Sequence, residues 1–108
     1  MRLTFLGTGT SFGVPVVGCD CATCRSDDPR DRRWRPSIYL ELADATRVLV
    51  DTSPDLRSQL LGAGVGELDA VVYTHDHADH VHGLDDLRQI VFNRRARRLT
   101  CRLAGSIT

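Results

Sequence analysis

The chain has 108 residues, a formal net charge of zero and 42% hydrophobic residues, which is typical of a globular domain and excludes a disordered or coiled-coil protein. No apolar run approaches the ~20 residues that a membrane-spanning helix needs, and glycines interrupt the N-terminus too early for a signal peptide, so we predict a cytoplasmic location. All fourteen basic residues are arginine, which excludes a Walker-type phosphate loop because that loop needs a lysine.

The first half of the chain predicts three strands and one long loop. A strand over residues 3–9 ends in a glycine turn. Residues 10–36 form a loop with three prolines and three cysteines, and a loop of this length is usually functional or needs an internal staple. Residues 37–42 and 47–51 read as two strands joined by a short turn, which predicts a hairpin.

The middle of the chain predicts a helix followed by a buried strand. Ser53 and Pro54 favour a helix start, with serine as N-cap and proline in the first turn. The helix should end at Gly62 or Gly64, since glycine terminates helices readily. The apolar stretch 68–74 then predicts a strand.

The last part of the chain predicts a helix, a basic break and a strand. Apolar residues recur at helical spacing within residues 83–93. The basic run 94–98 is more typical of a solvated helix end than of a nucleic-acid contact, and residues 99–104 read as a strand. Without repeats or linkers, residues 1–108 make up one domain at most.

All four histidines follow the predicted strand 68–74 within eight residues. On an extended segment, the side chains of His75 and His77 leave the same face, and Asp79 and His80 follow at the turn into the next helix. Imidazoles and a carboxylate suit Zn²⁺ and also accept Fe²⁺ or Mn²⁺. The alternative is a solvated polar loop, but the carboxyl end of a strand is where ligands tend to bind in α/β folds.

The stretch H-D-H-A-D-H-V-H-G-L at residues 75–84 resembles the H-x-H-x-D-H signature of the metallo-β-lactamase superfamily. The segments G-T-G-T at 7–10 and V-L-V-D at 48–51 match the order of that fold's first half. The resemblance implies an α/β fold: the N-terminal half of an αββα sandwich, a mixed sheet with flanking helices. Residues 1–108 would then form a single partial domain.

The same resemblance implies a centre with two zinc ions, or manganese or iron. His75 and His77 would bind the first metal, and Asp79 and His80 the second. Hydroxide made available by the metals would attack the substrate, and Asp79 would also assist proton transfer as a catalytic residue. Asp51 would orient a ligand histidine or, equally, cap the helix that begins near Pro54.

The segment G-V-P-V-V-G-C-D-C-A-T-C at residues 13–24 is similar to a segment of the phosphoribosyl cyclic phosphate phosphodiesterase family. The resemblance implies that Cys19, Cys21 and Cys24, with a histidine from late in the chain, hold a structural zinc. Such a metal would close a loop that has no core of its own. The alternative is free thiols or one disulfide. Cys101 reads as a buried apolar residue.

These resemblances imply a metal-dependent hydrolase, specifically a phosphodiesterase that cleaves a cyclic phosphate ester. The expected partner is a small phosphate ester, which arginines of the run 32–35 could bind, and membrane binding is not expected. A small zinc-binding module and an RNA-processing nuclease are the alternatives, although zero net charge argues against general nucleic-acid binding. The sequence leaves open whether the full-length protein forms a homodimer.

The match covers only the first half of the family's fold. The later ligands of that family include histidines, and no histidine follows His82, which itself reads as a pocket-edge or helix-surface residue. We therefore expect an N-terminal piece that is inactive, or nearly so, on its own. Its sheet should expose an apolar face that a second half would cover.

Overall fold

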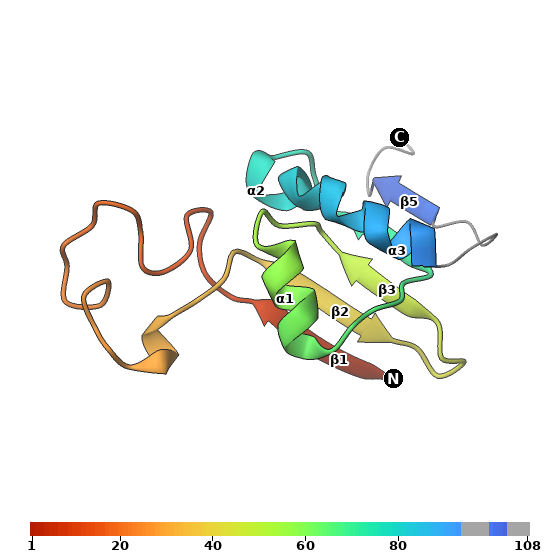
Figure 1. The fold of residues 1–108 in the computed structure, drawn as a ribbon, viewed down its shortest axis with the longest axis horizontal. Helices are drawn as coiled ribbons and strands as arrows, with labels where there is room; N and C mark the ends of the chain where they lie inside the picture. The colour runs from red at the N-terminus through yellow and green to blue at the C-terminus, as the bar shows by residue number, and fades with distance from the viewer. Residues whose placement is uncertain (94–99, 104–108) are drawn as a thin grey trace.

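The computed structural model describes residues 1–93 and 100–103. Its centre is one sheet of five strands whose spatial order follows the sequence (Figure 1). The strands are β1 (Arg2–Gly7), β2 (Ser37–Glu41), β3 (Arg47–Val50), β4 (Ala70–Tyr73) and β5 (Thr100–Leu103).

The sheet is mixed. β1, β2 and β3 pair antiparallel, whereas β3, β4 and β5 run parallel. A tight turn joins β2 to β3, and Ala45 adopts a left-handed φ of 68° within it. Because parallel strands end at the same edge, the segments that follow β3 and β4 lie side by side, and this edge carries the candidate site.

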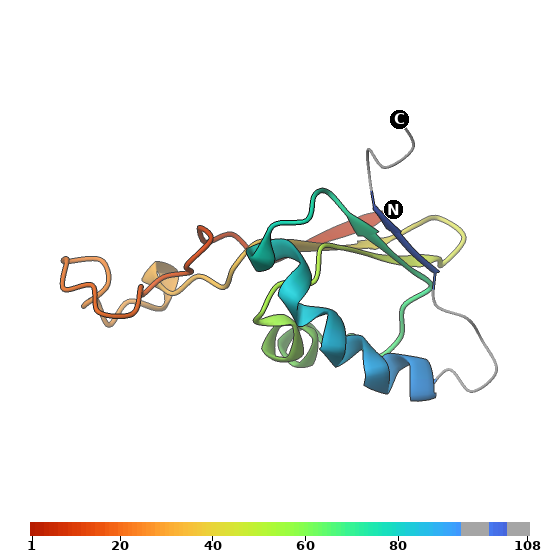
Figure 2. The ribbon, with the colours of Figure 1, turned by 90° about the horizontal axis from the view of Figure 1, so that it is seen from above.

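The helices α1 (Leu56–Ala63), α2 (Ala78–Val81) and α3 (Leu87–Asn93), with a 3-10 turn η2 (His82–Asp86), gather on one side of the sheet (Figure 2). Successive side chains of a strand point to opposite faces of the sheet, so every second side chain faces the helices and is buried beneath them. Together with the helices they form one core, made of Leu6, Tyr39, Leu49, Leu56, Leu60, Leu68, Val71, Tyr73, Leu87 and Ile90.

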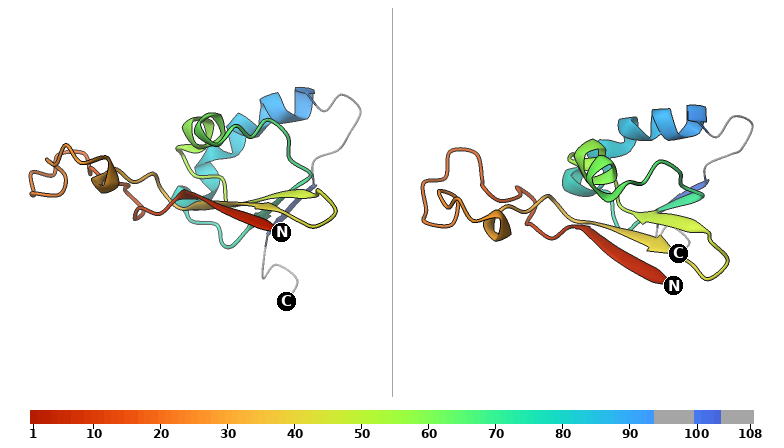
Figure 3. Two further views of the ribbon diagram at one scale, coloured as in Figure 1. Left: turned by 90° about the horizontal axis from the view of Figure 1, so that it is seen from below. Right: turned by 60° about the horizontal axis from the view of Figure 1, so that its bottom comes forward.

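The other face of the sheet is also apolar, but none of the described helices covers it (Figure 3). Two rows of aligned side chains cross it, and Leu3 and Phe5 at the β1 end are 46% and 68% exposed. The apolar face expected from the sequence is therefore present. The rows are Leu3, Leu40, Val48 and Ala70, then Phe5, Ile38, Val50 and Val72.

The segment between β1 and β2 extends away from the sheet (Figure 1). The prediction of a long loop is confirmed, but the loop has internal structure. It contains a 3-10 turn η1 (Pro29–Asp31), and Val14 and Arg33 pair through two backbone hydrogen bonds of 2.9 Å. The incoming and outgoing arms of the loop are therefore held together near the sheet.

Two helix boundaries differ from the prediction. The first helix starts at Leu56, because Ser53 caps the preceding turn: its Oγ accepts a hydrogen bond from the Asp55 N–H at 3.0 Å. Its end at Gly64, with φ of 69°, is one of the two predicted positions. The helical region expected over residues 83–93 starts earlier, at Ala78, and is divided into α2, η2 and α3.

The predicted fold class is confirmed: a mixed sheet with flanking helices. The basic run 94–98 and the side chain of Cys101 lie outside the described residues. No helix within the described ranges has the length and apolar character needed to cross a membrane.

Candidate metal centre

The candidate site lies at the edge where β3 and β4 end. The Asp51 N–H donates to the Val72 carbonyl at 2.8 Å, which continues the parallel ladder by one residue. Asp51 then turns with a left-handed φ of 65°, a conformation that aspartate tolerates better than most residues. This turn brings the Asp51 carboxylate beside the segment that follows β4.

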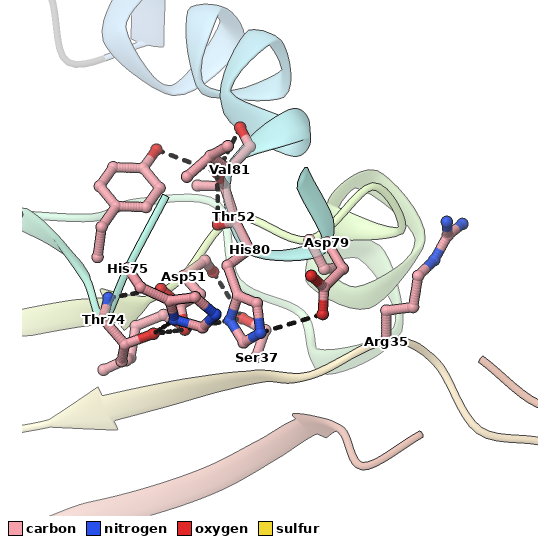
Figure 4. A network of polar contacts seen from close by, with 12 residues as sticks. Arg35, Ser37, Asp51, Thr52, Thr74, His75, Asp79, His80 and Val81 are labelled. Atoms are coloured by element: carbon pink, nitrogen blue, oxygen red, sulfur yellow. Dashed lines mark hydrogen bonds and ion pairs between the residues drawn. The ribbon is translucent and has the colours of Figure 1, made fainter. Parts of the chain in front are cut away.

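The Asp51 carboxylate is the hub of a polar network (Figure 4). Its Oδ1 accepts from the Thr74 N–H at 2.8 Å, and its Oδ2 contacts both the Thr74 hydroxyl at 2.8 Å and His80 Nδ1 at 2.7 Å. Asp51 is only 4% exposed. The Asp51 carboxylate thus contacts a candidate ligand histidine, as the orienting role predicted from the sequence requires. Its described contacts do not include the first turn of α1, which the alternative capping role would require.

Thr74 connects a second histidine to the same network. Its hydroxyl donates to Asp51, so it accepts from His75 Nδ1 at 2.8 Å. The ring of His75 lies 4.5 Å from that of His77 and 4.0 Å from that of His80, measured between centroids. The three imidazoles that the sequence singled out are therefore brought together, and His75 and His80 keep Nε2 for a ligand.

Asp79 completes the group. Its Oδ2 lies 3.1 Å from His80 Nε2, so the two side chains assigned to the second metal already face each other. Since Asp51 holds the Nδ1 proton of His80, the lone pair on Nε2 is left for a cation. The donor types and their pairwise approach fit a divalent metal such as zinc. Among the described residues, three donor atoms within 4.8 Å of one another occur only in the cysteine cluster and not among these four side chains.

The backbone after β3 fixes the position of α2. The Thr52 N–H donates to the His80 carbonyl at 2.9 Å, and the Gly83 N–H donates to the Thr52 carbonyl at 3.0 Å. A Cβ on Gly83 would lie 1.9 Å from the Ser53 carbonyl oxygen. This contact allows only glycine, and it locks the helical segment that carries Asp79 and His80 against the end of β3.

An ion pair borders the site. The Arg35 guanidinium binds both carboxylate oxygens of Asp55 at 2.9 and 3.0 Å, and the Arg35 N–H donates to Asp55 Oδ2 at 2.9 Å. This bidentate contact lowers the pKa of Asp55 and raises the pKa of Arg35, with a smaller contribution to Arg35 from the nearby Asp79. Figure 4 shows Arg35 on the Asp79 side of the site.

Sequence reasoning missed Thr74 as part of the site, although its position immediately before the first histidine was a usable signal. Arg35 belongs to the arginine run 32–35 that the sequence offered for phosphate binding, but its pairing with Asp55 spans 20 residues and had no local signal. His82 is exposed at the end of α2, in agreement with its interpretation as a surface residue.

The three cysteines of the loop form a second candidate site. The sulfur atoms of the three cysteines all lie within 4.8 Å of one another, and the thiols of Cys19, Cys21 and Cys24 are free. The Cys24 N–H and the neighbouring thiols lower the pKa of Cys21 to about 7. Three clustered thiols, one of them with a lowered pKa, fit a zinc ion, and their free state disagrees with the disulfide alternative.

Comparisons with known proteins point to one family. The family model described as a beta-lactamase superfamily domain matches residues 46–106. A crystal structure described as a new diphosphatase from the PhnP family superposes with a TM-score of 0.86 and 53% identity, over 92% of this chain and 40% of that one. Zn²⁺-bound PqqB from Methylobacterium extorquens shares the fold, with a TM-score of 0.75 and 23% identity over 95% and 46%.

Two curated relatives extend the comparison. A Porphyromonas gingivalis protein named octanoyltransferase is 54% identical over 94 residues, which are 87% of this chain and 19% of that protein. Coenzyme PQQ synthesis protein B of Rhodopseudomonas palustris is 33% identical over 101 residues, which are 82% of this chain and 33% of that protein. The chain therefore spans a third or less of the length of these curated relatives.

Proposed function

Since the chain belongs to the beta-lactamase superfamily, we propose that it supplies the metal-binding part of a hydrolase that cleaves phosphate esters, with a cyclic phosphodiester as the preferred substrate. One observation carries this proposal. The ring of His75 lies beside those of His77 and His80, His80 faces Asp79, and the buried Asp51 orients His80 at the edge of the sheet.

The related structures support phosphate chemistry and zinc. The PhnP-family protein, described as a diphosphatase, is 53% identical over most of this chain, and the PqqB structure is described as Zn²⁺-bound. Octanoyl transfer is not proposed, because the match covers only 19% of the protein with that name.

The proposed roles of the residues come from the family resemblance and are supported by their contacts. His75 and His77 would bind one cation, and Asp79 and His80 a second, zinc being preferred over manganese or iron. A bound divalent cation would polarise a phosphoryl oxygen of the substrate and acidify water. The contacts of Asp51 with His80 and of Thr74 with His75 support protons held on Nδ1, and Asp79 would exchange a proton with the reacting group.

Other properties of the protein follow from this proposal. A third zinc at Cys19, Cys21 and Cys24 would stabilise the long loop without touching the substrate. The expected partner is a small phosphate ester, with no role for a membrane or for nucleic acid. A homodimer is the proposed assembly of the full-length protein, and the cytoplasm its proposed location.

The decisive experiment is hydrolysis of bis(p-nitrophenyl) phosphate and of 2′,3′-cyclic AMP by the product of the complete reading frame, beside the 108-residue chain. We expect zinc-dependent turnover by the former, reduced at least about 100-fold by His77→Ala, with His82→Ala as the matched control. Activity on thioesters or lactones alone would refute the phosphodiesterase proposal.

The zinc-binding module is the second candidate, and the proximity of the three cysteine sulfurs favours it. It predicts stoichiometric zinc in the complete gene product with no turnover of any ester. The same assay therefore separates the two proposals.

A further inference from the structure

A hollow of about 350 Å³ lies where the end of β1 meets the segment that leads into β2. Small-molecule sites begin at about this size. Three of the residues that line it are arginines and none is acidic, although the whole chain carries no net charge. The side chains that matter are Phe5, Thr8, Arg30, Arg32, Arg33 and Trp34.

The walls of the hollow are held in place by hydrogen bonds. The Gly9 N–H donates to the Trp34 carbonyl at 2.7 Å. The Arg33 side chain donates to Thr8 Oγ1 at 2.9 Å and to the Arg30 carbonyl at 2.8 Å. The hollow is therefore preformed, which lowers the entropic cost of binding a ligand.

One aromatic ring is exposed beside these arginines. Trp34 is 50% exposed, and such a ring offers a flat face on which a planar base can stack. Arg30 is paired with Asp28 at 2.8 Å, but this pair is at the surface, so an anion can share the guanidinium at little cost. Guanidinium groups bind phosphate oxygens in a bidentate manner.

The hollow belongs to the same edge of the sheet as the candidate metal centre. Gly7 in its lining pairs with Ser37 at the start of β2, and the Ser37 hydroxyl donates to the Asp51 carbonyl at 2.9 Å. Trp34 is the chain neighbour of Arg35, which borders Asp79 (Figure 4). A substrate held at the metal centre would thus extend along this edge towards the hollow.

We propose that this hollow binds the non-reacting end of the substrate, and that this end is a nucleotide: its base stacks on Trp34 and its phosphate binds Arg32 with its neighbours. The inference rests on the proposed phosphate-ester hydrolase and names its substrate class. Guanidinium groups alone would accept any phosphate, but the exposed ring of Trp34 selects one that carries a planar base.

Trp34 is the only tryptophan of the chain, so intrinsic fluorescence excited near 295 nm reports directly on the hollow. We expect AMP to change the emission saturably, and adenosine, ribose 5-phosphate and inorganic phosphate each to bind at least about tenfold more weakly. Arg32→Ala should weaken AMP binding about tenfold or more, since a charge-assisted hydrogen bond contributes roughly 1.5–3 kcal/mol. Arg2→Ala, at the opposite end of β1, is the matched control and should change nothing.

The inference would be overturned by no response to AMP, by equal affinity for AMP and inorganic phosphate, or by unchanged AMP binding in the double variant Arg30→Ala/Arg32→Ala. Binding of an RNA oligonucleotide but not of AMP would also overturn it, in favour of a nucleic-acid surface.

His77→Ala separates this inference from the proposed function, because His77 lies outside the hollow. If it abolishes hydrolysis by the complete gene product and leaves AMP binding intact, both stand. Hydrolysis without AMP binding refutes only the proposal that the hollow binds a nucleotide. AMP binding without any hydrolysis in the unsubstituted protein refutes only the hydrolase.

Discussion

At the scale of single residues, the structure depends on one buried carboxylate. Asp51 accepts from Thr74 and His80 while it is nearly inaccessible to solvent. A charge in this position is tolerated because three hydrogen bonds compensate for its desolvation. The network, extended through Thr74, therefore determines the orientation of the His75 and His80 imidazoles before any metal binds.

Asp51→Asn should weaken zinc binding at the histidine site by about 10- to 100-fold. Asparagine accepts the left-handed backbone, but its NH₂ group would face His80 Nδ1 and force the proton onto Nε2, the nitrogen needed for the metal. Zinc titration followed by the imidazole NMR signals measures this change. Asp85→Asn, on exposed η2, is the control, and equal affinities in the two variants would contradict the orienting role.

The ion pair between Arg35 and Asp55 makes stability depend on pH. The pKa of Asp55 is lowered in the folded protein from its ordinary value of 3.8, so its stabilising contribution is complete above that pH and is lost as the pH falls through the lower, folded value. Asp55→Asn should reduce the free energy of unfolding at pH 7 by about 1–3 kcal/mol.

Urea unfolding of both proteins between pH 7 and pH 2 tests this expectation. The difference between them should shrink only below about pH 4. A difference that stays constant down to pH 2 would show that the charge of Asp55 does not matter.

At the scale of helices and strands, alanine substitutions at two glycines of the described chain are expected to have opposite effects on stability. A methyl group on Gly83 would meet the Ser53 carbonyl, whereas one on Gly62 in α1 would meet nothing within 4 Å. Gly83→Ala should therefore destabilise the protein by roughly 1–3 kcal/mol or more, and Gly62→Ala should stabilise it by about 0.5–1 kcal/mol. Thermal unfolding measures both, and equal effects would contradict the close approach of η2 to the end of β3.

The cysteine loop should respond to metal as a separate element. Zinc should protect Cys19, Cys21 and Cys24 from iodoacetamide, and a chelator should restore their reactivity without loss of the circular dichroism of the sheet, because the loop lies outside it (Figure 1). Trypsin releases all three in one peptide of residues 3–25, away from Cys101. Alkylation at equal rates with and without zinc would refute this site.

Several elements could be predicted from the sequence because their determinants are local. Alternating residues located β2 and β3 to within one residue, and the glycine at 64 marked the end of α1. The region after β4 could not be predicted in detail. Its first two helical elements are positioned by contacts of His80 and Gly83 with Thr52 and Ser53 that no local pattern reveals. The histidine cluster was visible, whereas its connection through Thr74 required the fold.

At the scale of the whole molecule, the sheet has one covered and one open face. The two apolar rows on the open face should cause the 108-residue chain to associate with itself. The double variant Leu3→Lys/Leu40→Glu places opposite charges on directly paired positions, which keeps the strands compatible and should lower the association measured by sedimentation velocity. Leu61→Lys, at an exposed position of α1 on the helix side of the sheet, is the control and should not lower it.

The parallel pairing of β3 with β4 has a consequence for how the protein folds. Asp51 and His80 are 29 residues apart, and their contact requires a crossover through α1, which is slow to close compared with the β2–β3 hairpin. The histidine centre should therefore assemble late, on a sheet that has already formed. The three cysteines lie within six residues of one another, so they can capture a metal while the rest of the chain is still unfolded.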